Sequence, residues 1–520
     1  MIMKKFLCIL ALIALTLSLR IAYFHTRQVL SADGCQYMHI ARNIAAGEGF
    51  TSYYHQYLAF DYPIPHPVRN WPPLVPLIMA GGLSVWGQEN PEFVGKSINL
   101  LINLLIMLPL YLTAQKLFGR TVALLSLVLY AFYIPMVYFS SGIIAQVPYI
   151  FFFIFSFYFF LMFLEDRKFL PLFLAGICAG LAYLSRYEGI ALLPMYMLAY
   201  LVKRTGPEED KLTCKEFFLS TAVFLGSFVV VALPWWVRNI MVAGTPIIND
   251  QARLMLTHSF IKNWEKYNYL PGIDYPTTLE YITGQPVYVL KTTLGNLFCL
   301  VRDFYFNGPA LFVLGNLGLL FATKKWRKMF PFWIFIIFYF LFFSFMTNEI
   351  RYLFSISWIW LILSAYLLHY MYIRFKDKAR LFFVLAMIFF LIPLTVYEAV
   401  ALFKKADQFG LEWKEAGFYL KDACTKETVI MARKPVFSFY AGCGFVSLPY
   451  AETDMMAAYC KKYDVRFLVY DERLALHVRP WLSWLLEGPE DRLPDWLEKK
   501  AILGESPGRV AIYRVNTNFL

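Results

Sequence analysis

Charged residues are scarce in this chain of 520 residues. Asp, Glu, Lys and Arg make up 16% of it, whereas a typical soluble domain contains about 25%. Hydrophobic residues account for 59% and aromatic residues for 19%. This composition excludes an ordinary soluble enzyme. Most of the chain must lie in lipid, where apolar runs of about 20 residues have to be helices because unpaired backbone groups cannot be hydrated there.

Cysteine patterns typical of metal sites or disulfide frameworks are also missing. The eight cysteines are scattered, with no C-x-x-C pair and no Cys/His spacing that suits zinc. Three of them, Cys424, Cys443 and Cys460, share the C-terminal region, where one pair can oxidise if that region lies outside the cytoplasm. The sequence also lacks internal repeats, low-complexity tracts and coiled-coil heptads.

The formal net charge of +12 does not indicate a nucleic-acid partner. Basic residues stand in short clusters between apolar runs rather than over one face of a folded domain, which is a signal of membrane topology. The apolar runs predict about eleven transmembrane helices. They cover residues 6–23, 91–115, 121–139, 146–164, 169–185, 188–202, 216–236, 294–321, 330–346, 352–373 and 381–400.

If successive helices cross the membrane in alternating directions, the basic clusters between them all fall on one face of the membrane, together with Lys4 and Lys5. The clusters are Lys116 and Arg120, Arg167 and Lys168, Lys203 and Arg204, residues 324–328 and residues 374–380. By the positive-inside rule this face is cytoplasmic. No small-x-small cleavage site follows the first run, so we expect an uncleaved first helix and a multi-pass protein of the inner (plasma) membrane.

The threading divides the chain into a membrane domain, residues 1–404, and an extracytoplasmic domain, residues 405–520. Two outer loops, residues 25–90 and 238–293, lie on the same side as the second domain. Short runs predict a small α/β fold there, with strands at Thr428–Ala432, Val465–Tyr470 and Val510–Val515 and helices at Trp413–Ala423 and Asp454–Lys462. In the first loop, Gly34–Ala46 and Pro72–Trp86 predict helices too short to span, lying in the interface plane.

Five ionisable residues fall at the outer ends of the predicted helices: Asp33, Arg186, Glu188, Arg238 and Arg351. Such residues are costly beside lipid unless they face protein or water, so they are candidates for a functional site. Simpler roles stay open for each alone, because an arginine can merely anchor a helix end and Asp33, in S-A-D-G, can cap one. Their common outer placement favours one shared site.

Five stretches also follow one another in a characteristic order. They are DGCQYMHIARNIAAGEGF (Asp33–Phe50), PPLVPL (Pro72–Leu77), GLAYLSRYEG (Gly180–Gly189), PWWVRN (Pro234–Asn239) and RYLF (Arg351–Phe354), and the tail adds VIMARKPVFSFYAG and LPY. In this order they resemble the GT-C glycosyltransferases of the protein O-mannosyltransferase and lipid A aminoarabinose transferase type. The resemblance covers nearly the whole chain.

This resemblance implies a polytopic α-helical GT-C fold and a transfer reaction at the outer face of the membrane. Enzymes of this type move a sugar from a polyprenyl-phosphate carrier to an acceptor, which is a protein, a lipid or a glycan. Transfer proceeds by direct displacement with inversion, and the donor arrives already activated on lipid, so no nucleotide-binding fold is needed. The expected partners are therefore the lipid-linked sugar, the acceptor and membrane lipid.

The resemblance also assigns roles to individual residues. Asp33 matches the catalytic aspartate of the first loop, and the outer arginines, Arg186, Arg238 and Arg351, match positions for the carrier phosphate. A carboxylate can accept the proton of an attacking hydroxyl, and guanidinium groups suit phosphate oxygens. We add Glu188 as an orienting carboxylate and Tyr37 as a ring that can stack on a sugar.

Three positions depart from the family pattern. Gly34 and Gln146 stand where relatives often have acidic residues, and Gln146, retained as a substrate-binding candidate, is a poor base and metal ligand. Trp71 stands where relatives often have a basic residue, so Arg69 is a candidate substitute at the phosphate. His55, Asp61 and His66 share the first loop but lack a helical ligand spacing, so we expect neither a metal nor another cofactor.

Two alternatives from other classes remain at this point. A secondary transporter or lipid-carrier flippase would show inverted repeats, broken helices and ionisable residues deep within its spans. An envelope-assembly scaffold without enzymatic activity would leave the placement of the aspartate and the arginines unexplained.

Overall fold

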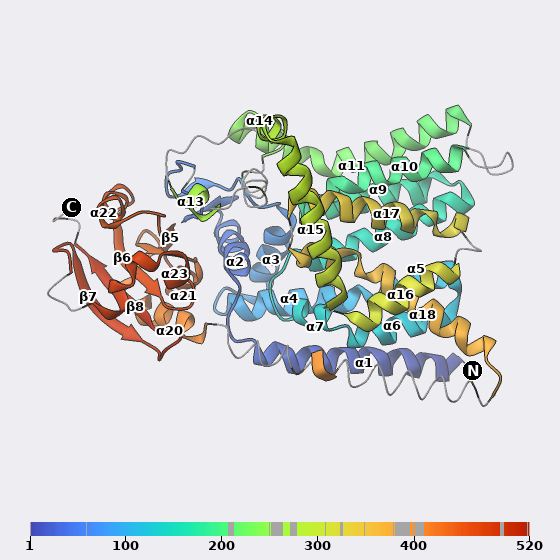
Figure 1. The fold of residues 1–520 in the computed structure, drawn as a ribbon, viewed down its shortest axis with the longest axis horizontal. Helices are drawn as coiled ribbons and strands as arrows, with labels where there is room; N and C mark the ends of the chain where they lie inside the picture. The colour runs from blue at the N-terminus through green and yellow to red at the C-terminus, as the bar shows by residue number, and fades with distance from the viewer. Residues whose placement is uncertain are drawn as a thin grey trace.

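The computed structural model has a long helical body at one end and a small sheet-containing domain at the other (Figure 1). It describes residues 2–58, 60–205, 213–248, 250, 260, 264–270, 278–306, 308–322, 326–347, 349–377, 379, 396–398, 400, 410–488, 493–516 and 518. The predicted helix at 381–400 and parts of the second outer loop therefore lie largely outside the described residues.

The helical body follows the apolar runs of the sequence. Its helices are α1 (Ile2–Thr26), α4 (Pro91–Leu105), α5 (Met107–Phe118), α6 (Arg120–Phe132), α7 (Ile134–Ser140), α8 (Gln146–Asp166), α9 (Phe169–Ser185), α10 (Leu192–Thr205), α11 (Cys214–Ala243), α15 (Pro286–Phe306), α16 (Pro309–Phe321), α17 (Trp326–Met346) and α18 (Ser357–Arg374). Among the described residues, four helices are long and apolar enough to cross a membrane, or up to six if each bent pair is one span. The predicted α-helical membrane class is confirmed, while this test does not establish the predicted number of eleven.

Two of the predicted single helices are broken in the structure. The run at 294–321 divides into α15 and α16, which meet at 106°, and the run at 121–139 divides into α6 and α7, which meet at 62°. Pro309 and Pro135 stand in the first turn of the second helix in each case. A proline has no N–H to donate and clashes with the preceding turn, so these two single-helix predictions were wrong.

Small residues allow the helices to approach each other closely. This is expected in a membrane, because apolar side chains gain little by leaving lipid and helix association depends on close packing instead. A side chain at Gly176 of α9 would come within 1.9 Å of Ser227 Oγ on α11. Ser156 of α8 donates a hydrogen bond to the Ala175 carbonyl at 2.7 Å and accepts one from the Tyr196 hydroxyl at 3.0 Å. Helices α8, α9, α10 and α11 thus form one packed group.

The C-terminal domain contains most of a six-stranded sheet with the order β2-β5-β4-β6-β8-β7. Its strands are β2 (Tyr54–His55), β4 (Val429–Ala432), β5 (Gly444–Ser447), β6 (Val465–Asp471), β7 (Leu497–Leu503) and β8 (Val510–Val515), and its helices include α20 (Leu411–Leu420), α21 (Val436–Ala441) and α22 (Thr453–Lys462). β2, β5, β4 and β6 are parallel, and β8 and β7 are antiparallel additions. The predicted α/β fold is confirmed, and all three predicted strands are present.

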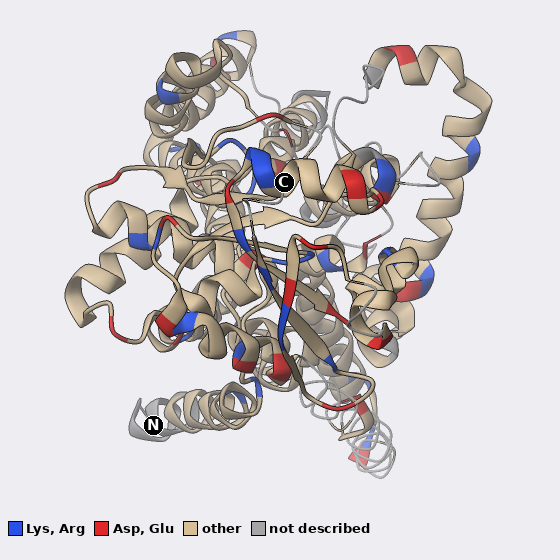
Figure 2. Cartoon of the chain, turned by 90° about the vertical axis from the view of Figure 1, so that its left-hand side faces the viewer, with Lys and Arg blue, Asp and Glu red and all other residues tan. Residues whose placement is uncertain are grey.

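The edge strand β2 comes from the first outer loop, so that loop and the C-terminal domain share one sheet. The same loop contains α2 (Ala32–Ala45) and α3 (Leu74–Trp86), the two short helices predicted from apolar spacing. Both lie between the sheet domain and the helical body (Figure 1). Seen from the sheet domain, acidic and basic residues are interspersed rather than separated by sign (Figure 2).

Candidate active site

Asp33 lies in the first turn of α2 with its carboxylate turned into the protein. Helix α2 is capped by Ser31, whose Oγ accepts a hydrogen bond from the Gly34 N–H at 3.1 Å. Asp33 is therefore not the cap, and the capping alternative raised by the sequence is resolved in favour of Ser31. The carboxylate of Asp33 is left available for a partner elsewhere in the fold.

That partner is Arg351, in the 3₁₀ helix η4 (Ile350–Ile356) that leads into α18. Arg351 Nη1 donates to Asp33 Oδ2 at 3.1 Å, and its Nε lies 2.6 Å from Glu349 Oε2. The guanidinium of Arg351 therefore links two carboxylates, one from the first loop and one from its own segment.

A second pair lies beside the first. Arg186 follows the last turn of α9, and Glu188 lies in the 3₁₀ helix η1 (Tyr187–Ala191); Arg186 Nη2 donates to Glu188 Oε1 at 2.7 Å. The ring of Tyr352 joins the pairs, because the Cζ atoms of Arg186 and Arg351 lie 5.0 and 5.3 Å from its centroid. Both distances fit cation–π contacts.

One cavity of about 230 Å³ brings these groups together. Its polar lining includes Asp33, Arg186, Glu188 and Arg351 with Tyr37, and its apolar lining includes Ile190, Ile247, Phe342, Phe343 and Met346. A charged end beside apolar walls can hold a polar headgroup next to a hydrocarbon chain. Five residues singled out from the sequence therefore share one cavity.

The cavity also includes residues that sequence reasoning missed. Trp71 lines it, lies 4.8 Å from Tyr37 between ring centroids, and donates its indole N–H to Gln36 Oε1 at 2.6 Å. Tyr352 and Asn70 line it as well. Tyr352 stands within the R-Y-L-F stretch, so its position next to Arg351 was the signal that could have identified it.

Three other candidates lie elsewhere. Arg69 pairs with Asp250 at 3.3 Å, and Gln146 is buried at the start of α8 with 3% of its surface exposed. Arg238 lies inside α11, which continues to Ala243 beyond the expected helix end, and it donates to the carbonyls of Val68 (2.7 Å) and Phe50 (3.3 Å). None of the three is in the lining of the cavity that contains Asp33. Their assignment to substrate stays a prediction.

The two histidines weighed as metal ligands, His55 and His66, are buried. His55 Nε2 accepts a hydrogen bond from the Tyr62 N–H at 3.2 Å, and the rings of His55 and His66 lie 6.1 Å apart. Burial lowers the pKa of both imidazoles to about 4. Across the described ranges, no group of three His, Cys, Asp or Glu side chains could hold a metal ion.

The described cysteines are thiols. Cys424 and Cys443 are neighbours whose side chains contact each other, whereas Cys460 lies beside Met431, with Sγ and Sδ 3.9 Å apart. Of the pairs considered from the sequence, the fold brings Cys424 and Cys443 together.

Known proteins resemble this chain in family pattern and in fold. A family model described as dolichyl-phosphate-mannose-protein mannosyltransferase matches residues 70–236. A search of the curated proteins finds no match. Among solved structures, the oligosaccharyltransferase AglB from the archaeon Archaeoglobus fulgidus, in complex with an inhibitory peptide and a dolichol-phosphate, is similar with a TM-score of 0.61 and 13% identity, covering 98% of this chain and 74% of that one.

ArnT from Cupriavidus metallidurans, bound to undecaprenyl phosphate, is similar over 98% of both chains, with a TM-score of 0.57 and 14% identity. AglB in complex with Zn and sulfate gives a TM-score of 0.64 at 14% identity, over 97% of this chain and 72% of that one. The chain therefore shares its fold with these GT-C proteins, and its apolar helices support a multi-pass membrane protein. The resemblance inferred from the sequence, to GT-C glycosyltransferases that use polyprenyl-phosphate donors, is confirmed.

Proposed function

We propose that this protein is a membrane glycosyltransferase that transfers a sugar from a polyprenyl-phosphate carrier to an acceptor at the extracytoplasmic face of the inner membrane. The observation that carries this proposal is the pairing of Asp33 with Arg351 in a cavity with apolar walls. The family match and the shared fold with structures that contain dolichol-phosphate or undecaprenyl phosphate support it. The donor sugar is a hexose or a pentose, and the acceptor is a protein, a lipid or a glycan.

In the proposed step, the acceptor hydroxyl attacks the anomeric carbon of the sugar. A bond forms between the acceptor oxygen and that carbon, the bond from the carbon to the phosphate oxygen breaks, and its electron pair leaves with the phosphate. Asp33 accepts the hydroxyl proton. Attack on the side opposite to the phosphate inverts the anomeric configuration.

The ion pair gives Asp33 a second effect on the reaction. Arg351 is neutralised by Asp33 as long as the carboxylate is charged. When Asp33 takes up the proton, this attraction is lost, and the guanidinium becomes more available to the phosphate at the moment when the phosphate gains charge. Proton acceptance and stabilisation of the leaving group are thus coupled through Arg351. Neither a metal nor a nucleotide cofactor is part of the proposed step.

A direct assay tests the proposal. Purified full-length protein is mixed with a radiolabelled polyprenyl-phosphate sugar and a membrane extract, and label is followed into protein, lipid and glycan fractions. We expect transfer by the wild type and none by Asp33→Asn. If proteoliposomes that contain the protein move labelled carrier across their membrane but transfer no sugar, the result would instead indicate a transporter or flippase. Reporter fusions after residue 90 test the orientation, since an extracytoplasmic reporter is expected there.

A further inference from the structure

Part of the lining of the candidate active-site cavity consists of uncharged residues from the first outer loop, which we call the uncharged wall: Tyr37, Asn70, Trp71 and Pro72. Tyr37 belongs to α2, and the other three lie directly before α3. Asp33 and Tyr37 are four positions apart in α2, so they stand on the same face of that helix. The uncharged wall therefore adjoins the carboxylate of the proposed base.

Trp71 and Tyr37 form an aromatic corner in this wall. Their ring centroids lie 4.8 Å apart, and their planes meet at 67°. In such an edge-to-face contact one ring turns its edge to the other, so one of the two rings keeps both faces free of its partner. The C–H groups of a sugar ring carry partial positive charge because their carbons bear oxygen, and they pack favourably on the negative face of an aromatic ring.

The orientation of Trp71 is fixed from behind. Its indole N–H donates to Gln36 Oε1 at 2.6 Å, and the amide of Gln36 in turn donates to Gln56 Oε1. Only 6% of Trp71 and 4% of Gln36 is exposed. The single polar group of the indole is thus satisfied within the protein, and what Trp71 offers to the cavity is ring surface.

The chain that leads into the wall is anchored as well. The carbonyl of Val68 accepts a hydrogen bond from Arg238 Nη1 at 2.7 Å, and Arg69 Nε lies 3.3 Å from Asp250 Oδ2. The basic residue nearest to the wall in the sequence, Arg69, is therefore bound to a carboxylate, and it is not part of the cavity lining. An anionic group at the uncharged wall would find no cation there.

Asn70 provides a polar group in the same wall. Its Oδ1 is buried and has no hydrogen-bond partner in the part of the chain that the structure describes. A buried acceptor without a partner costs about 1–3 kcal/mol. The last torsion of an asparagine side chain has a broad energy profile, so the amide can turn towards the cavity at little cost. A sugar hydroxyl that donates to Oδ1 would remove the penalty.

The charged groups of the cavity are already paired with one another. Asp33 accepts from Arg351 at 3.1 Å, and Glu188 accepts from Arg186 at 2.7 Å. A carboxylate or an ammonium group on the sugar would have to break one of these pairs or lie unpaired against the uncharged wall. Both are costly where water is partly excluded.

From these contacts we infer that Tyr37, Asn70 and Trp71 bind the sugar of the donor and restrict it to an uncharged sugar. The C–H face of the sugar lies on the aromatic corner, and one of its hydroxyls meets the amide of Asn70. The inference rests on the proposed function and deepens it, because it names the class of sugar. Neutral hexoses and pentoses fit this wall, whereas uronic acids and sugars with a free amine do not.

A binding assay on full-length protein tests the inference. Its four ligands are undecaprenyl phosphate alone and undecaprenyl phosphate that carries glucose, glucuronate or glucosamine, three sugars that share one ring and differ in charge. The variants are Trp71→Ala, Trp71→Phe and Asn70→Leu. Trp86→Ala is the matched control, because Trp86 ends α3 and 67% of it is exposed. Melting temperatures verify that each variant is folded.

We expect the wild type to bind the glucose-loaded carrier at least about tenfold more tightly than either charged form. Trp71→Ala and Asn70→Leu should each raise the Kd for the glucose-loaded carrier about tenfold and leave that for the bare carrier within about threefold. Trp71→Phe, which keeps an aromatic ring, and Trp86→Ala should stay within about threefold for both ligands.

Two results would overturn the inference. One is equal affinity of the wild type for the three loaded carriers. The other is a loss of affinity in Trp71→Ala and Asn70→Leu that is as large for the bare carrier as for the loaded one, since the two residues would then only support the fold. A wild type that shows the expected preferences but transfers no sugar refutes the proposed function and leaves the sugar-binding role in place.

Discussion

Asp33 accepts a hydrogen bond from Arg351 at 3.1 Å, although 318 positions of sequence separate the two residues. The pair joins the first outer loop to the segment that begins the last described membrane helix. It orients the carboxylate of Asp33, and at the same time it places a negative charge against a cation that lines the cavity. Replacing Asp33 should therefore affect turnover and anion binding in opposite directions.

Asp33→Asn preserves the shape of the side chain but removes its charge and its ability to accept a proton. We expect turnover to fall at least about 100-fold, as for loss of a general base. Binding of undecaprenyl phosphate should become stronger, since Arg351 loses one of its two carboxylate partners and keeps only Glu349. Asp61→Asn is the control, because Asp61 is exposed in the same loop and pairs with Lys462. Turnover near the wild-type value in Asp33→Asn would contradict the assignment of the base.

Substitutions of Arg351 and Arg238 should have different effects, the first on carrier binding and the second on thermal stability. Arg351→Ala removes a cavity-lining cation, so we expect the Kd for undecaprenyl phosphate to rise about tenfold. Arg238→Ala removes two hydrogen bonds to loop carbonyls, so we expect a lower melting temperature with carrier binding within about threefold of wild type. Both variants are measured by binding and by thermal unfolding in detergent. The reverse pattern would place Arg238, rather than Arg351, at the phosphate.

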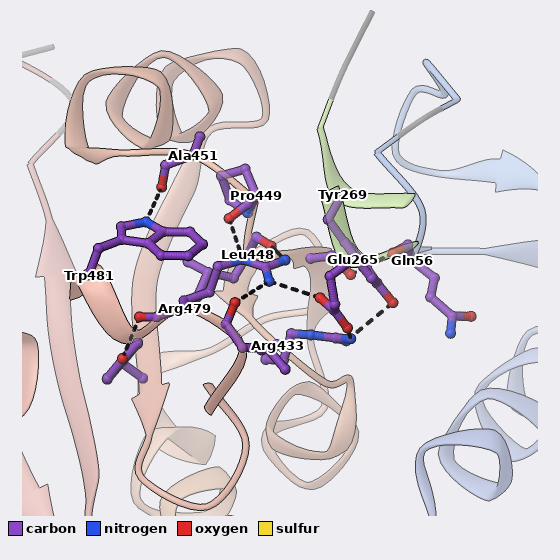
Figure 3. Close-up of polar contacts among 12 residues, drawn as sticks. Gln56, Glu265, Tyr269, Arg433, Leu448, Pro449, Ala451, Arg479 and Trp481 are labelled. Carbon is purple, nitrogen blue, oxygen red and sulfur yellow. Dashed lines mark hydrogen bonds and ion pairs between the residues drawn. The ribbon is translucent and has the colours of Figure 1, made fainter. Parts of the chain in front are cut away.

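Glu265→Gln should destabilise the contact between the second loop and the C-terminal domain. Glu265 accepts hydrogen bonds from Arg433 and Arg479, and Tyr269 accepts one from Arg433; we call this buried cluster the Glu265 clamp (Figure 3). Its two arginines are almost completely buried, and removing their shared carboxylate leaves them without a counter-charge. Breaking a buried pair in this way costs about 3–5 kcal/mol. Limited proteolysis and thermal unfolding measure the effect, and Glu498→Gln on the exposed side of β7 is the control. Equal stability of the two variants would exclude a structural role for the clamp.

Acid should destabilise the first outer loop through two of its buried histidines, His55 and His66. Burial lowers the pKa of His55 and of His66 to about 4, whereas an unfolded imidazole has a pKa of about 6.5. The unfolded chain therefore binds protons first, and stability falls as the pH drops from about 6.5 towards 4. Melting temperatures across this interval measure the effect. His55→Gln should flatten the dependence, and an unchanged slope would count against the buried histidines as its source.

Gly176→Ala tests the packing of α9 against α11. The added methyl group would meet Ser227 Oγ at 1.9 Å and the Phe224 carbonyl at 2.4 Å, so the helices must separate. We expect a loss of about 1–3 kcal/mol in stability, as for overpacked cores. Gly226→Ala on α11 is the matched control, because its methyl group would meet nothing within 4 Å. Similar melting temperatures for both variants would argue against close packing at Gly176.

The membrane class, the α/β character of the C-terminal domain and the grouping of Asp33 with Arg351 could all be predicted without coordinates. Each rests on local information: the length of an apolar run, the alternation in a short strand, or a charged residue next to a predicted span. The breaks before Pro135 and Pro309 were missed although both prolines are visible in the sequence. A hydropathy profile averages over many residues, so a single proline hardly changes it. The helix itself is interrupted at that residue, because proline has no backbone N–H to donate.

What the sequence by itself determined is which runs are apolar enough for membrane helices and which residue types stand at the ends of these runs, because the cost of burying charge or leaving backbone groups unpaired depends on composition alone. Only the tertiary structure decided that Ser31 rather than Asp33 caps α2, that β2 completes the sheet of another domain and that Arg238 binds loop carbonyls. The pairing of β2 and the contacts of Arg238 join segments far apart in the sequence, which packing selects and no local pattern encodes.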